Sequence, residues 1–315
     1  SGSLNSGTLS LTGSLGTYSI NVSAGGTLTQ ARFESDGGSG SIIWLDDVVC
    51  FAQGTRVVTD RGDVAVEDLR AGDLVATVDG PARTFEPVKW IGTRRVDLAK
   101  HKARPIVDPV RFRAGSLGDG LPARDLVVSP PHAMLIDGKL IPAKMLVNDM
   151  TIVRERDAAS VTYYHVELDR HAAILAEGVA SETYLDTGNR GFFANAGRVM
   201  AFGAEYDANH ASETWATDSC APLTTDAEAV RPYRDAYAAR AVAMGWTPVE
   251  YATTADADMH VVADGRRIDA IEVSGRKHVF VLPRGASDVR LASRAGIPSM
   301  LDSLTEDHRP LGVFG

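Results

Sequence analysis

Short β-strand signals, each closed by a tight turn, recur from Cys50 to about residue 190. The run from Asp73 to Val78 is mostly apolar and β-branched, and the pair Asp79-Gly80 closes it. A second such pair, Asp137-Gly138, follows a similar run. Asp-Gly pairs favour the turns that join two antiparallel strands, because both residues tolerate positive φ angles. The pattern therefore predicts a β-rich unit built largely of hairpins.

Changes in composition divide the chain into three parts. Residues 1–49 are rich in Gly, Ser and Thr and alternate with a period of two, which predicts short strands without an aliphatic core of their own. Residues 50–192 carry the dense strand signals, and residues 193–315 form a smaller C-terminal domain, either α+β or like a β-sandwich. In this last part a helix is predicted from Asp226 to Met244, with Pro232 as an alternative first-turn position.

Charge and composition exclude several classes of function. The formal net charge is −9, so no broad basic surface is available for a phosphate backbone, and we expect no nucleic-acid partner. No apolar run approaches the roughly 20 residues that cross a bilayer. No clustered His and Cys residues predict a metal site, and we expect no cofactor. The sequence predicts a soluble protein, which we expect to be a monomer.

Three short blocks carry residues suited to cleaving a peptide bond. They are Cys50-Phe51-Ala52-Gln53-Gly54-Thr55, then Leu126-Val127-Val128-Ser129-Pro130-Pro131-His132-Ala133, and then Tyr164-His165-Val166-Glu167-Leu168 followed by His171. In this order and spacing they resemble the blocks of Hedgehog/intein (Hint) self-processing domains, and two further runs are similar to the bacterial branch. The resemblance covers residues 50 to about 190 and implies the horseshoe-like all-β Hint fold. The expected fold class is mainly β.

The chemistry of such a domain explains the residue types. An acyl shift from nitrogen to sulfur at Val49-Cys50 needs a sulfur nucleophile, which Cys50 supplies. The departing amide nitrogen must gain a proton, and His132 is the expected donor because the pKa of histidine can be tuned across neutrality. Ser129 is expected to hydrogen-bond the scissile carbonyl or amide. His165 is an auxiliary candidate, for which a purely structural role is the alternative.

Two departures from the family narrow the expected outcome. Inteins end in a His-Asn pair whose asparagine releases the downstream segment, but residues 180–183 read Ala-Ser-Glu-Thr. Splicing is therefore not expected. The region resembling the loop that holds the sterol-activating aspartate of Hedgehog proteins is Trp90–Arg94, and Asp97 lies out of register. The acceptor of the acyl group is then water, an amine or a thiol, and the substrate is the chain's own upstream segment.

Alternatives remain open at this point. Cys220 is read by default as a buried structural residue, and otherwise as a disulfide partner that locks Cys50 or as a second acyl acceptor. A competing function is a non-catalytic adhesion or carbohydrate-binding module on a Hint scaffold, and a third is a cysteine peptidase that acts on other proteins. The Gly/Ser/Thr-rich upstream segment indicates a secreted or cell-surface parent.

Overall fold

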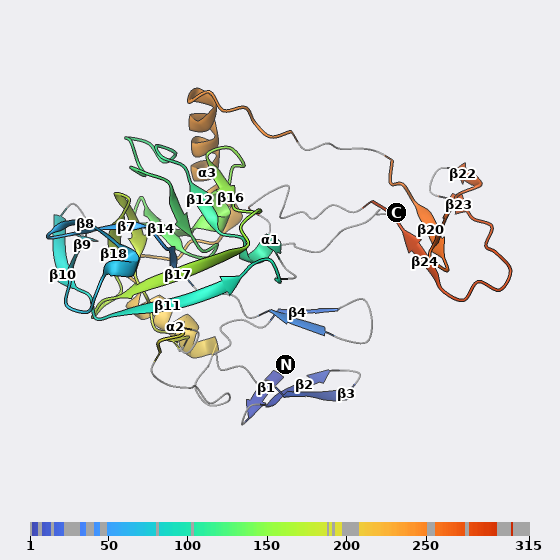
Figure 1. Ribbon diagram of the computed structural model, residues 1–315, viewed down its shortest axis with the longest axis horizontal. Helices are drawn as coiled ribbons and strands as arrows, with labels where there is room; N and C mark the ends of the chain where they lie inside the picture. The colour runs from blue at the N-terminus through green and yellow to red at the C-terminus, as the bar shows by residue number, and fades with distance from the viewer. Residues whose placement is uncertain are drawn as a thin grey trace. The chain divides into compact units, whose positions relative to one another are not determined.

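The computed structural model of the chain contains two compact units, residues 1–248 and 249–315, which we describe separately (Figure 1). The structure describes residues 2–5, 8–13, 16–21, 32–35, 41–44, 49–79, 82–101, 104–187, 189–190, 193–196, 208–250, 256–274, 277–294 and 304. Within these ranges no helix is both long and apolar enough to cross a membrane.

The described residues of the upstream region form short antiparallel pairings. One is a three-stranded sheet in the order β1-β2-β3, and the other is a two-stranded hairpin. These strands are β1 (Gly2–Asn5), β2 (Thr8–Gly13), β3 (Gly16–Asn21), β4 (Arg32–Ser35) and β5 (Ser41–Trp44). The short strands predicted for this region are therefore present among its described residues.

The first unit is mainly β, as predicted, and its larger sheet has eight strands in the order β10-β9-β7-β18-β19-β14-β15, with β8 paired to β7. These are β7 (Arg56–Thr59), β8 (Gly62–Ala65), β9 (Leu74–Asp79), β10 (Ala82–Pro87), β14 (Ala133–Ile136), β15 (Lys139–Pro142), β18 (Ala173–Ala176) and β19 (Val179–Glu182). At the turn between β14 and β15, Asp137 and Gly138 have φ angles of 48° and 72°. The predicted hairpin is thus present with the expected positive φ at both residues.

A second sheet of six strands runs in the order β11-β17-β6-β13-β12-β16. Its members are β6 (Phe51–Ala52), β11 (Trp90–Asp97), β12 (Val110–Phe112), β13 (Leu126–Val128), β16 (Ile152–Arg154) and β17 (Ser160–Glu167). The strand that begins one residue after Cys50 therefore lies at the centre of this sheet. Short helical turns connect the strands at η1 (Val66–Asp68), α1 (Arg104–Val107) and η2 (Ala143–Leu146).

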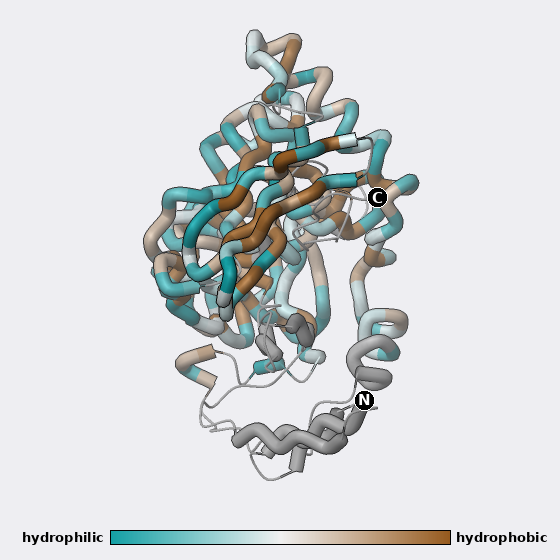
Figure 2. Tube along the Cα trace, turned by 90° about the vertical axis from the view of Figure 1, so that its right-hand side faces the viewer, coloured by the Kyte–Doolittle hydropathy of each residue, from teal (hydrophilic) through white to brown (hydrophobic). Residues whose placement is uncertain are grey.

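Both sheets contribute buried side chains. Figure 2 shows apolar and polar residues interspersed along the chain of this unit. The largest side chains that are fully buried are Phe51, Leu98, Phe112, Leu126, His132, Met134, Leu140, Ile141, Leu146, Ile152, His165 and Ile174. Burying a histidine this deeply removes its ring nitrogens from water, which is unfavourable unless they are compensated. The two histidines of this group are therefore the unusual members of the core.

Two helices follow the sheets, α2 (Ala208–Asp218) and α3 (Ala227–Ala243). Two starts were predicted for the second of these helices, Asp226 and Pro232, and the structure has the first. The Asp226 side chain caps the helix by accepting a hydrogen bond of 2.9 Å from Ala229 N. Pro232 lies inside α3 rather than at its start. Helix α3 contacts η2 and belongs to the first compact unit, which ends at Pro248. The polar sequence of α2 gave no helix prediction.

The second unit consists of short strands in the residues that the structure describes. Three of them form a sheet in the order β21-β20-β24, and two form a hairpin. They are β20 (His260–Ala263), β21 (Arg266–Asp269), β22 (Glu272–Ser274), β23 (Lys277–Val279) and β24 (Val289–Ala292).

Candidate functional site

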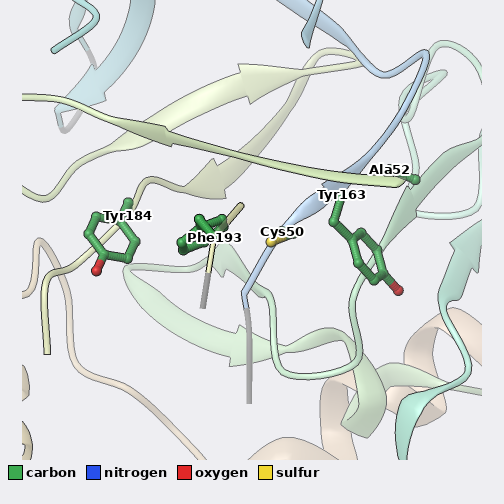
Figure 3. Packing of buried hydrophobic residues seen from close by; sticks show 5 residues of the cluster. All are labelled: Cys50, Ala52, Tyr163, Tyr184 and Phe193. Carbon is green, nitrogen blue, oxygen red and sulfur yellow. The ribbon is translucent and has the colours of Figure 1, made fainter. Parts of the chain in front are cut away.

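Cys50 lies at the entry to the central strand of the six-stranded sheet and is fully buried. It belongs to a cluster with Ala52, Tyr163, Tyr184 and Phe193, as Figure 3 shows. Tyr163 pairs in register with Ala52, which places both side chains on the face that Cys50 also occupies two residues away. The sheet therefore fixes the position of the predicted nucleophile.

Ser129 forms two hydrogen bonds to Cys50. The backbone N–H of Cys50 donates to Ser129 Oγ at 2.8 Å, and the backbone N–H of Ser129 donates to the Cys50 carbonyl at 2.9 Å. Ser129 is only 3% exposed. Of the two contacts expected for Ser129, the structure shows the one to the amide nitrogen of the Val49–Cys50 bond.

His132 lies in the turn that Ser129 opens, and its backbone N–H donates to the Ser129 carbonyl at 3.1 Å. Its ring packs against Phe51, with 4.4 Å between the ring centroids. Within the described part of the chain neither ring nitrogen has a hydrogen-bond partner. Burial lowers the pKa of His132 to about 3, with a smaller contribution from His171. Burial therefore keeps the His132 ring neutral near pH 7.

His165 lies on β17 and joins the same buried group. Its ring centroid is 5.8 Å from that of His132 and 5.3 Å from that of Tyr184. Burial lowers the pKa of His165 well below its ordinary value, and nearby His132 adds to the effect. In the register of β11 and β17 its partner is Gly92, where an added Cβ would lie 2.5 Å from the Phe193 ring. Glycine at this position leaves room for the aromatic cluster beside His165.

The groups around Cys50 have opposing effects on the pKa of its thiol. Burial raises the pKa of its thiol well above the ordinary value, and the carboxylate of Glu182 raises it further. The guanidinium of Arg94 acts in the opposite direction and lowers the pKa of the thiol. Because desolvation is the largest effect, the resting side chain is a neutral thiol.

Glu182 is a site residue that sequence reasoning missed. Its Oε1 accepts a hydrogen bond of 2.6 Å from the backbone N–H of Ala133, the residue after His132. Its Oε2 lies 3.6 Å from Nε2 of His171. Burial raises the pKa of Glu182. A glutamate at the end of a strand gave no sequence signal, since only the fold brings it to this turn.

His171 connects Glu182 to Cys220. The backbone N–H of Cys220 donates to His171 Nδ1 at 3.0 Å. Burial alone lowers the pKa of His171, but the side chains of Cys220 and Glu182 outweigh burial and raise the pKa to about 9. The default reading of Cys220 as a buried residue is wrong, because it is exposed. Both cysteines are free, so the structure contains no disulfide between Cys220 and Cys50.

A shallow depression lies beside the bond that Ser129 holds. Its walls come from β11, β17, the end of α1 and the loop after β13. The residues that line it are Arg94, Val96, Val107, Ser129, Pro130, Pro131 and Tyr163. Elsewhere, no group of three or more His, Cys, Asp or Glu residues among those described could hold a metal ion.

Comparison with known proteins agrees with this arrangement. Residues 49–188 match the family model described as the Hint domain, so the match begins one residue before Cys50. This segment has the Hint fold, which supports a self-processing function in general. No curated protein matches the chain.

Solved structures of inteins and an intein-like domain are similar to the chain. The bacterial intein-like domain of Clostridium thermocellum is 13% identical, with 44% of this chain and 100% of that chain covered and a TM-score of 0.28. A DnaB intein from Synechocystis is 12% identical, with 44% and 99% covered and a TM-score of 0.31. The MchDnaB-1 intein is 17% identical, with 42% and 99% covered and a TM-score of 0.31.

Proposed function

We propose that the chain cleaves its own backbone between Val49 and Cys50 through a thioester and does not splice. The observation that carries this proposal is the hydrogen bond of 2.8 Å from the Cys50 N–H to Ser129 Oγ. This hydrogen bond places the Ser129 hydroxyl beside the Cys50 nitrogen, which is the leaving group of the proposed reaction. A hydroxyl that accepts from an amide N–H in the resting state is able to donate once that nitrogen becomes an amine with a lone pair.

The proposed first step is an acyl shift. The Cys50 sulfur attacks the Val49 carbonyl carbon, the bond between that carbon and the Cys50 nitrogen breaks, and one proton moves from sulfur to nitrogen. A neutral imidazole has one N–H and one bare nitrogen, so it is able to accept the thiol proton and supply another. We assign this relay to His132, which is neutral because it is buried and lies in the same turn as Ser129.

The proposed second step is transfer of the acyl group to water, an amine or a thiol. The stretch 180–183 lacks both the histidine and the asparagine that release a downstream segment in inteins. Residues 50–315 should therefore remain one polypeptide. His165 is proposed as a positioning residue, since its ring contacts that of His132. We also propose that the parent protein is secreted or displayed on the cell surface.

Intact-mass measurement tests the proposal directly. The purified chain is incubated with and without dithiothreitol, in parallel with Cys50→Ala. Two fragments, residues 1–49 and 50–315, are expected from the unchanged chain with the thiol, and only the full-length mass from the variant. Persistence of the full-length mass in both samples of the folded, unchanged chain would overturn the proposal. Equal behaviour of Cys50→Ala would instead favour a non-catalytic scaffold.

A further inference from the structure

Two of the residues that line the depression are also neighbours of Cys50, the proposed nucleophile. Ser129 is hydrogen-bonded to Cys50 in both directions, and Tyr163 belongs to the buried cluster that contains Cys50. A molecule in this depression would contact Ser129 and Tyr163, which are both neighbours of Cys50. This makes the depression the natural approach for an acceptor.

The β-ladder places Arg94 on the same side of the sheet as Cys50. Arg94 pairs with Tyr163 across β11 and β17, and Tyr163 pairs with Ala52 across β17 and β6. Residues paired in this way project to the same face, and Cys50 shares that face because it is two residues from Ala52. Arg95 projects to the opposite face, where its Nη2 donates to Ser160 Oγ at 3.3 Å.

The walls of the depression give it one sign of charge. Four of the seven lining residues are apolar, namely Val96, Val107, Pro130 and Pro131, and none of the seven is acidic. Apolar walls screen a charge less than water does, so the field of the Arg94 guanidinium extends across the depression. The Arg94 guanidinium also lowers the pKa of the buried Cys50 thiol, which is consistent with a field that extends to the reaction centre.

We propose that the depression is the acceptor subsite of the processing reaction, and that Arg94 selects small nucleophiles with an anionic group close to the attacking atom. This inference rests on the proposed self-cleavage. With a thiol acceptor, the thiolate sulfur attacks the Val49 carbonyl carbon and the bond from that carbon to Cys50 Sγ breaks. Cys50 leaves as a thiolate and takes a proton from water. The upstream segment leaves as the thioester of the acceptor, with the anionic group beside Arg94 during attack.

Three thiols of similar size test this selectivity. They are 2-mercaptoethanesulfonate, 2-mercaptoethanol and cysteamine, which carry a negative, a neutral and a positive group on the same two-carbon chain. Second-order rate constants of cleavage are measured by intact mass and compared at equal thiolate concentration. In the unchanged chain the anionic thiol is expected to be about fivefold faster than the cationic one, as a partly exposed charge pair allows.

Variants at two neighbouring positions separate this effect from general activation of Cys50. Arg94→Met should reduce the ratio of the anionic to the cationic rate to near one, Arg94→Glu should invert it, and Arg94→Lys should keep it. Arg95→Met is the matched control, because it removes the same charge from the other face and should leave the ratio unchanged. A ratio is insensitive to the absolute reactivity of Cys50, which Arg94 also affects. Circular dichroism identifies variants that fail to fold.

A salt series in the unchanged chain needs no variant. Raising the ionic strength to about 1 M shortens the screening length to about 3 Å, so the preference should disappear. Equal rates for the three thiols at low salt, or a preference that Arg94→Met and Arg95→Met change alike, would overturn the subsite and leave self-cleavage intact. No cleavage by any of the three thiols would overturn both proposals.

Discussion

The hydroxyl oxygen of Ser129 lies 2.8 Å from the backbone nitrogen of Cys50 and accepts its hydrogen, across 79 positions of sequence. The contact is buried, and the return hydrogen bond from Ser129 N to the Cys50 carbonyl holds the two residues in one relative orientation. The nitrogen that leaves in the proposed acyl shift is therefore held in one position relative to the Ser129 hydroxyl.

Replacing Ser129 by alanine should slow thiol-induced cleavage by roughly ten- to a hundredfold. The variant leaves a buried N–H without its partner, and a lost hydrogen bond of this kind is worth about 1–3 kcal/mol. Cleavage rates come from the time course of the intact mass, with Cys50→Ala as the blank. Ser129→Thr keeps the hydroxyl and should retain most of the rate. An unchanged rate in Ser129→Ala would show that the contact is structural only.

Stability should fall in acid because of the buried histidines. The pKa of His132 is lowered to about 3 in the folded chain, whereas it is about 6.5 in an unfolded chain. Between these values the unfolded chain binds more protons, so the free energy of unfolding rises with pH through this window and is lost progressively as pH falls below about 6.5. His165 contributes in the same direction.

Urea unfolding at several pH values between 4 and 8 measures this slope. His165→Phe removes one of the two groups and keeps an aromatic ring in the cluster, so its slope with pH should be smaller than that of the unchanged chain. His260→Phe, in the second unit, is the control and should leave the slope of the first unit's transition unchanged. A free energy of unfolding that does not change between pH 4 and 7 would contradict the lowered pKa values of His132 and His165.

The Hint blocks made the strands and the main residues of the site predictable. Hairpins follow from local turn chemistry, as Asp137 and Gly138 show with their positive φ angles. Cys50, Ser129 and His132 came from ordered motifs, and the structure brings them together. The pKa of His132 could not be predicted, because it depends on burial by residues distant in sequence. Glu182 and Arg94 were missed as site residues for the same reason, since each reaches Cys50 only through the arrangement of the two sheets.

Gly92→Ala should destabilise the first unit by about 1–3 kcal/mol, the usual effect of overfilling a packed site. An added Cβ would lie 2.5 Å from Phe193 and 2.6 Å from Trp90, both of them ring atoms in a tight aromatic group. Urea unfolding gives the change. Phe193→Ala in the same chain should relieve part of it, so the double variant should be more stable than the sum of the single changes implies. Strict additivity would contradict the contact.

Glu182→Gln should move the pH dependence of cleavage to lower pH. The carboxylate of Glu182 raises the pKa of the Cys50 thiol, so removing its charge makes the thiolate easier to form. Glutamine keeps an oxygen that accepts the hydrogen bond from Ala133 N, which preserves the turn holding His132. The measurement is the rate of thiol-induced cleavage between pH 6 and 9, together with the histidine signals in a proton NMR titration. His171 should titrate lower than its value of about 9, because it loses the carboxylate beside Nε2.

Glu177→Gln is the matched control, since Glu177 is also buried but pairs with Arg124. If the two glutamine variants shift the profile equally, Glu182 acts on overall stability and not on the Cys50 thiol.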